Sequence, residues 1–151
     1  MKNRKILYID MDGVLVDFDS EAKMVNANTF KKHNDDICNI PGIFLKMKPM
    51  PGAISAYKKL SKKFDTYILS TAPWDNPSAW SDKLQWVKKY LGEAARKRLI
   101  ITYHKNLNKG DYLIDDMKKN GAEKFTGKFI LFGSDYFPDW HAILKYLLKQ
   151  K

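Results

Sequence analysis

The sequence has very little cysteine and histidine: Cys38 is its one cysteine among 151 residues, beside three histidines. One cysteine cannot form an internal disulfide, and no His/Cys group has the spacing of a zinc site. No apolar run approaches the roughly 18 residues that a membrane helix needs. The apolar stretch Ile6–Ile9 is too short for a signal peptide, because Asp10 interrupts it. We therefore expect a cytoplasmic protein without membrane contact.

Charge of one sign is in excess, since 27 Lys and Arg residues against 17 Asp and Glu residues give a net charge of +10. A basic chain favours an anionic partner, either nucleic acid or a phosphorylated metabolite. The lysines are spread over polar helix faces, and no Arg-rich stripe or nucleic-acid motif is present. We interpret most of them as solvated surface that can raise the encounter rate with a nucleotide, and we do not expect a nucleic-acid partner.

Five short apolar segments alternate with helical patterns along the chain. Each segment is apolar on both faces, as a parallel strand buried between helices should be. The predicted strands are Ile6–Asp10, Thr66–Ser70, Leu99–Thr102, Tyr112–Ile114 and Phe129–Phe132.

Three helices between these strands have readable boundaries. One begins after Pro51 and Gly52, and the last begins near Pro138. The middle helix has Asn76 as its predicted N-cap and Pro77 at its first position. Its predicted inward stripe, at helical spacing, is Trp80, Leu84, Val87 and Leu91.

The alternation predicts an α/β fold with a three-layer, Rossmann-like parallel sheet in the order 3-2-1-4-5. Residues 18–48 break the alternation and are too long for a plain loop. We interpret 18–48 as a small helical cap, inserted after strand 1 over the carboxyl edge of the sheet. Residues 1–17 and 49–151 would then form the core domain.

Polar residues lie at the ends of four of the predicted strands or within a few residues after them. Ligands bind at the carboxyl ends of the strands in an open parallel sheet, so these side chains are expected to meet at one edge. Any one of them alone is better explained as a cap, a turn or a surface lysine, but their convergence favours a site. The set is Asp10, Asp12, Ser70, Thr71, Lys105, Asp115 and Asp116.

This set suits hydrolysis of a phosphate monoester. Carboxylates can hold Mg²⁺ through oxygen ligands, and an aspartate can act as a covalent nucleophile for phosphate. A second carboxylate two residues away can serve as general acid. A lysine and a hydroxyl can neutralise and hold the phosphoryl oxygens.

Several segments carry a family resemblance. Asp10–Phe18 resembles the first motif of the haloacid dehalogenase-like phosphatases, and Tyr67–Pro73 resembles the second. Lys105 suits the third-motif lysine, and Asp111–Asp116 resembles the fourth motif. Together with Lys48–Ala53, these segments make the chain most similar to the 5'(3')-deoxyribonucleotidases.

The resemblance implies a role for each motif position. Asp10 would be the nucleophile and a magnesium ligand. Asp12 would protonate the leaving oxygen and then activate water, with its backbone carbonyl on the metal. Asp115 would be a further ligand, supported by Asp116. The phosphate would be held by Thr71, Ser70 and Lys105.

The resemblance also implies a base-binding wall. Phe18 matches the aromatic residue that stacks on the nucleobase, and Phe44 and Trp74 are candidate further walls whose alternative role is ordinary packing. The segment Met117–Asn120 departs from the better-known animal enzymes, which carry an Arg-Pro sequence there. The preferred base and sugar, the 5' or 3' position of the phosphate, and the choice between monomer and homodimer stay open.

The predicted function is Mg²⁺-dependent hydrolysis of nucleoside monophosphates, with deoxyribonucleotides favoured. One alternative keeps the chemistry but acts on a sugar phosphate or another small phosphoester. A second is a phosphate-accepting receiver module without fast turnover, against which Asp12 argues because it supplies an acid/base group. A third is a nucleic-acid-binding protein that uses the basic charge.

Overall fold

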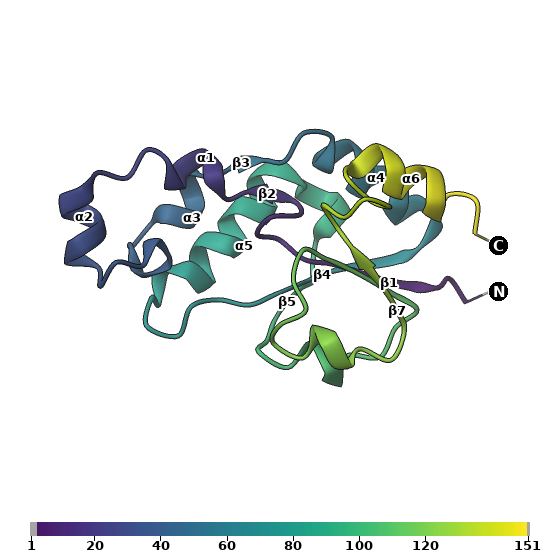
Figure 1. The fold of residues 1–151 in the computed structure, drawn as a ribbon. Coiled ribbons are helices and arrows are strands. Elements are labelled where there is room, and N and C mark those ends of the chain that lie inside the picture. The colour runs from purple at the N-terminus through teal and green to yellow at the C-terminus, as the bar shows by residue number, and fades with distance from the viewer. Residues whose placement is uncertain (1–2, 151) are drawn as a thin grey trace.

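The computed structural model describes residues 3–150, and a parallel five-stranded sheet forms its centre (Figure 1). The sheet order is β5-β4-β1-β6-β7, which confirms the predicted order and the α/β fold. The inner strands β1, β4 and β6 are largely buried, which explains their apolar sequences on both faces. The strand bounds are β1 Ile6–Ile9, β4 Asp65–Ser70, β5 Leu99–Ile101, β6 Tyr112–Asp115 and β7 Lys128–Leu131.

The two faces of the sheet are covered unequally. Helices α4 (Ala53–Lys63), α5 (Ser78–Tyr90) and α6 (Trp140–Leu147) lie together on one side in Figure 1. The other face carries a smaller core in which Tyr8 and Phe125 pack edge to face. The 3-10 helix η4 (Ala122–Lys124) belongs to this smaller core and lies beside η3 (Lys105–Leu107), whereas η2 (Gly92–Ala95) packs with α5 in the main core. The third layer is therefore thin in the described part of the chain.

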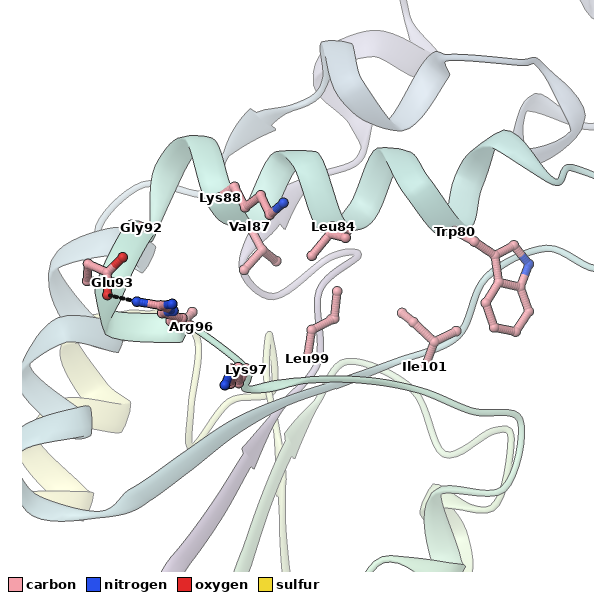
Figure 2. A pocket seen from close by; sticks show the side chains of 11 residues that line it. Trp80, Leu84, Val87, Lys88, Gly92, Glu93, Arg96, Lys97, Leu99 and Ile101 are labelled. Atoms are coloured by element: carbon pink, nitrogen blue, oxygen red, sulfur yellow. Dashed lines mark hydrogen bonds and ion pairs between the residues drawn. The ribbon is translucent and has the colours of Figure 1, made fainter.

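Helix α5 presents a different face to the core from the one that its apolar periodicity predicts. Val87 and Leu91 are buried as expected, but Trp80 and Leu84 are 40% and 43% exposed. Figure 2 shows the latter two beside a hollow between α5 and β5. The rotation follows from polar contacts made by the buried face, whose residues are Ala79, Asp82, Lys83, Trp86 and Val87.

Asn76 does not cap α5 as predicted, because no side-chain capping bond is made at that helix end. Its amide nitrogen instead donates to the carbonyls of Cys38 at 2.8 Å and Ile40 at 3.1 Å. Farther along α5, the Trp86 indole donates to the Met47 carbonyl at 2.9 Å. These bonds fasten residues 38–47 to α5 by satisfying carbonyls that the core would otherwise leave unpaired.

The segment between β1 and α4 contains short helices flanked by a two-stranded ribbon. The ribbon pairs β2 (Val16–Asp17) with β3 (Lys48–Pro49) in antiparallel fashion. Residues 23–26 are not helical and separate the first two helices of this segment. Its helices are α1 Asp19–Ala22, α2 Ala27–Lys32, η1 Ile37–Asn39 and α3 Ile43–Lys46. Within residues 3–150, no helix has the length and apolarity that crossing a membrane requires.

Candidate active site

A cavity of about 490 Å³ opens at the carboxyl end of the central strands. Its lining draws on the loop after β1, the segment 18–48, and the ends of β4 and β6. The predicted site residues that line it are Asp10, Asp12, Phe18, Thr71, Lys105, Asp115 and Asp116. The topology thus brings together side chains that are more than a hundred residues apart in sequence, as the switch-point rule anticipates.

The loop after β1 is held in a tight turn that aims its carboxylates into the cavity. The Met11 carbonyl accepts hydrogen bonds from the backbone amides of residues 14, 15 and 16, at 2.8 to 3.1 Å. Trp140 of α6 donates its indole N–H to the Val14 carbonyl at 2.9 Å. Gly13 has φ +75°, and a Cβ there would lie 2.1 Å from the Asp116 carboxylate. Glycine is therefore required both by the backbone and by the close approach of Asp116.

Asp10 and Asp115 share one buried lysine. Lys105 Nζ lies 3.1 Å from Asp10 Oδ1 and 2.6 Å from Asp115 Oδ2. Burial raises the pKa of Asp10 to about 7; Lys105 opposes this rise, while Asp115 and Asp12 add to it. Burial alone would lower the pKa of Lys105, but the two carboxylates outweigh it and raise that pKa. Lys105 thus stays a cation facing the cavity.

Asp10, Asp115 and Asp116 form a compact acidic cluster. One carboxylate oxygen from each lies within 4.8 Å of the others. Burial raises the pKa of Asp116 to about 6, with the charge of Asp10 as the next contribution. Burial also raises the pKa of Asp115, although Lys105 opposes that rise. Burial and mutual repulsion disfavour the ionised form of these three carboxylates, and a bound divalent cation would offset both effects. Closely spaced carboxylate oxygens are also the ligands that a hard cation prefers.

Asp12 is held apart from that cluster by a residue that the sequence analysis did not single out. Lys83 of α5 is fully buried, and its Nζ lies 2.5 Å from Asp12 Oδ2. The same nitrogen lies 3.0 Å from Ser70 Oγ. Asp12 Oδ1 is buried and has no hydrogen-bond partner among the described residues. The signal that could have found Lys83 is its spacing of three and four residues from Trp86 and Val87, on the buried face.

Of the remaining predicted residues, some line the cavity and others do not. Ser70 is buried behind the cavity lining, bonded to Lys83 and to the Thr71 carbonyl, while Thr71 lines the cavity. Phe18 lines the cavity, and Phe44 packs beneath it with ring centroids 6.4 Å apart. Trp74 is 78% exposed and outside the lining. Phe44 therefore has the packing role left open above, and Trp74 is not brought to the cavity.

A second hollow, of about 680 Å³, lies between α5 and β5. Figure 2 shows Leu84 and Val87 facing Leu99 and Ile101 across it, with Trp80 at one end. Its charged groups are Lys88, Glu93, Arg96 and Lys97, and Glu93 pairs with Arg96. A single carboxylate, already paired, cannot supply both a nucleophile and an acid, so the cavity at the strand ends is the candidate site.

Comparison with known proteins agrees with this geometry. Residues 36–145 match the family model described as "5' nucleotidase, deoxy (Pyrimidine), cytosolic type C protein". A protein of Vibrio phage KVP40, assigned as a 5'(3')-deoxyribonucleotidase, is 53% identical over 148 residues, covering 98% of this chain and 87% of that protein. A protein of Staphylococcus aureus strain Mu50 with the same assignment is 35% identical, covering 85% of this chain and 82% of that protein.

Solved structures support the fold. The HAD-hydrolase YfnB of Bacillus subtilis, determined with magnesium bound, superposes with a TM-score of 0.57 at 10% identity, covering 91% of this chain and 90% of that one. A haloacid dehalogenase-like protein of Streptococcus pneumoniae gives the same TM-score at 15% identity, with coverages of 97% and 92%. On the strength of the sequence matches, the chain belongs to the 5'(3')-deoxyribonucleotidase family, and it is a nucleotide phosphatase.

Proposed function

We propose that this phosphatase hydrolyses deoxyribonucleoside monophosphates to nucleoside and phosphate, through an aspartyl-phosphate on Asp10 and with Mg²⁺ as cofactor. One observation carries the proposal. A buried aspartate contacts Lys105 at the end of the central strand, and Asp12 lines the same cavity with one carboxylate oxygen unpartnered. That arrangement supplies a nucleophile, a cation for the phosphate and a separate acid/base group.

In the first half of the reaction, an Asp10 carboxylate oxygen attacks phosphorus and the bond from phosphorus to the deoxyribose oxygen breaks. Asp12 gives its proton to that leaving oxygen, which becomes the nucleoside hydroxyl. Lys105 and Thr71 hold the phosphoryl oxygens while charge moves onto them. The position of Lys105 within 3.1 Å of Asp10 supports this assignment.

In the second half, a water attacks phosphorus of the aspartyl-phosphate and the bond between phosphorus and the Asp10 oxygen breaks. Asp12, now a carboxylate, takes the proton from that water as general base. Phosphate leaves, and both aspartates return to their starting state. One residue can act in both halves because the nucleoside oxygen and the water occupy the same side of the phosphorus in turn.

The residues that would hold Mg²⁺ are Asp10, Asp115 and Asp116, with the Asp12 backbone carbonyl as a further oxygen donor. Their fit rests on the three clustered carboxylates and on the unfavourable ionisation of Asp10 and Asp116. When bound, the ion supplies positive charge to the phosphoryl oxygens. Asp116 lies against Gly13, which fixes its place in the cluster.

Substrate choice is assigned to the segment 18–48, acting as a cap on a core of residues 1–17 and 49–151. Phe18 starts that segment and lines the cavity, where its ring is available to stack on a nucleobase. A volume of about 490 Å³ is in the range of small-ligand sites. Because the matching family model is described as cytosolic, we place the activity in the cytoplasm.

The test is phosphate release from deoxyribonucleoside, ribonucleoside and sugar monophosphates, with Mg²⁺ and with chelator. Asp10→Asn should abolish release, and Asp135→Asn, which changes an exposed aspartate, should leave it unchanged. The proposal requires Mg²⁺-dependent release that is strongest on a deoxyribonucleotide. Stronger release from a sugar phosphate would refute the substrate assignment, and full activity of Asp10→Asn would refute the nucleophile.

A further inference from the structure

Lys83 is a lysine enclosed entirely within the fold. Its side chain is 0% exposed, and its Nζ contacts Asp12 Oδ2 at 2.5 Å and Ser70 Oγ at 3.0 Å. The ring of Phe44 lies over the same nitrogen, 4.8 Å from its centroid. Burying an ammonium group costs several kcal/mol even when it is paired, and a methionine or leucine of similar volume often stabilises a fold better. Stability alone therefore gives a poor reason for a lysine at this position.

Asp12, the ion-pair partner of Lys83, lies apart from the other carboxylates of the site. Asp12 is two residues from Asp10, yet its carboxylate is absent from the cluster formed by Asp10, Asp115 and Asp116. Lys83 reaches it from α5 and occupies Oδ2, while Oδ1 has no partner among residues 3–150. The ion pair thus ties one oxygen of Asp12 to the helix and leaves the other oxygen unengaged.

We propose that Lys83 is a positioning residue for Asp12: by holding Oδ2 it fixes the carboxylate at the cavity wall, turned toward the leaving-group oxygen and away from the acidic cluster. This inference rests on the proposed function, in which Asp12 is the acid/base group. Lys83 itself does not touch the substrate, because it is absent from the cavity lining. Its effect is transmitted through one salt bridge.

The lysine also connects this acid/base group to the aromatic ring that packs beneath Phe18. Phe44 comes from α3 of the segment 18–48, and its ring packs against Phe18 as well as over Lys83. The cation therefore lies between Asp12, which would protonate the leaving oxygen, and the Phe44 ring, which supports Phe18 from below. The negative face of the ring attracts the cation, most strongly where water is excluded.

The experiment compares two leaving groups in Lys83→Met. A nucleoside oxygen leaves as a strong base and needs a proton, whereas the nitrophenolate of p-nitrophenyl phosphate leaves without one. The parameter is kcat/KM, because it reports phosphoryl transfer to Asp10 and is free of the later hydrolysis of the aspartyl-phosphate. Lys88→Met, an exposed lysine farther along α5, is the matched control.

General acid catalysis contributes roughly 100- to 10,000-fold to rate. We expect Lys83→Met to lower kcat/KM for a deoxyribonucleotide by about 100-fold and for p-nitrophenyl phosphate by less than about 5-fold. Asp12→Asn should show the same leaving-group pattern. The double variant Lys83→Met/Asp12→Asn should be no worse than Asp12→Asn, because residues that act as one unit are not additive.

Equal losses on both substrates, or losses that multiply in the double variant, would assign Lys83 a merely structural role and overturn the proposal. Circular dichroism and a thermal melt establish folding. If Lys83→Met does not fold, Lys83→Arg keeps a cation with altered reach, and the ratio of the two kcat/KM values is read in that variant. Wild-type protein without deoxyribonucleotidase activity would sink the proposed function instead, so the two failures are distinguishable.

Discussion

Replacing Asp10 with asparagine is expected to stabilise the metal-free protein above pH 7 while abolishing turnover. Burial raises the pKa of Asp10 to about 7 in the folded chain, from 3.8 when it is free. Between these two values the folded chain keeps a proton that the unfolded chain has lost. The folded state binds more protons in that window, so this group's contribution to stability falls as pH rises from about 4 to about 7. Asparagine cannot ionise, and the variant escapes that loss.

The magnitude follows from the difference between the two pKa values. Each pKa unit corresponds to roughly 1.4 kcal/mol, so ionising Asp10 in the fold costs about 4 kcal/mol. We expect about 2 to 4 kcal/mol of stabilisation in Asp10→Asn at pH 8, since the amide loses the favourable contact with Lys105. For a chain of this length that corresponds to a rise in Tm of roughly 5–10 °C. At pH 4 the two proteins should differ little.

The assay is urea unfolding of wild type and Asp10→Asn at pH 4 and pH 8 in the presence of chelator. Asp135→Asn controls for the loss of an exposed negative charge. Adding Mg²⁺ at about 100 times its dissociation constant should stabilise the wild type by about 2.7 kcal/mol and the variant by much less. A variant that is less stable than wild type at pH 8, or one whose advantage is the same at both pH values, would refute the reasoning.

Three further substitutions test other parts of the site. Phe18→Ala should raise KM for a deoxyribonucleotide by about 10-fold, since base stacking is worth roughly 1–3 kcal/mol; an equal rise for p-nitrophenyl phosphate would remove Phe18 from base recognition. Gly13→Ala places a Cβ 2.1 Å from an Asp116 oxygen and should lower Mg²⁺ affinity, measured by calorimetry; unchanged affinity would mean that the cluster can shift. Trp74→Ala should leave kcat/KM for nucleotides within about 2-fold, because Trp74 is outside the cavity; a larger loss would return it to the site.

The sheet, and the edge at which the candidate site lies, were predictable for a physical reason. Strands buried on both faces, such as Thr66–Ser70, must be continuously apolar, so they stand out from amphipathic helices. Polar residues directly after such strands can only lie at the carboxyl edge of the sheet. The carboxylates Asp10, Asp12 and Asp115 were therefore identifiable from sequence, and the cavity brings them together.

Helix α5 shows why the rest was not predictable. A periodicity argument assigns apolar residues to the inside, and it selects Trp80 and Leu84 over Lys83. The folded chain buries Lys83 instead, because Asp12 and Ser70 supply partners from other elements. Those partners are 71 and 13 residues away, so no local pattern reports them. Distant partners also explain Asn76, whose amide bonds the carbonyls of Cys38 and Ile40 and does not form the local helix cap that its position suggests.

The charges of the cavity explain why a basic protein would need a cation at its centre. Four carboxylates face two buried lysines: Asp10, Asp12, Asp115 and Asp116 against Lys83 and Lys105. Fully ionised, this set has two negative charges in excess and would repel a phosphate dianion. Burial is the main cause of the raised pKa values of Asp10 and Asp116, and neighbouring carboxylates add to both. A bound divalent cation would balance these two negative charges. The phosphate dianion, attracted by the net charge of +10, would then not be repelled when it reaches the cavity. Affinity for phosphate should therefore depend on the metal even where no chemistry occurs.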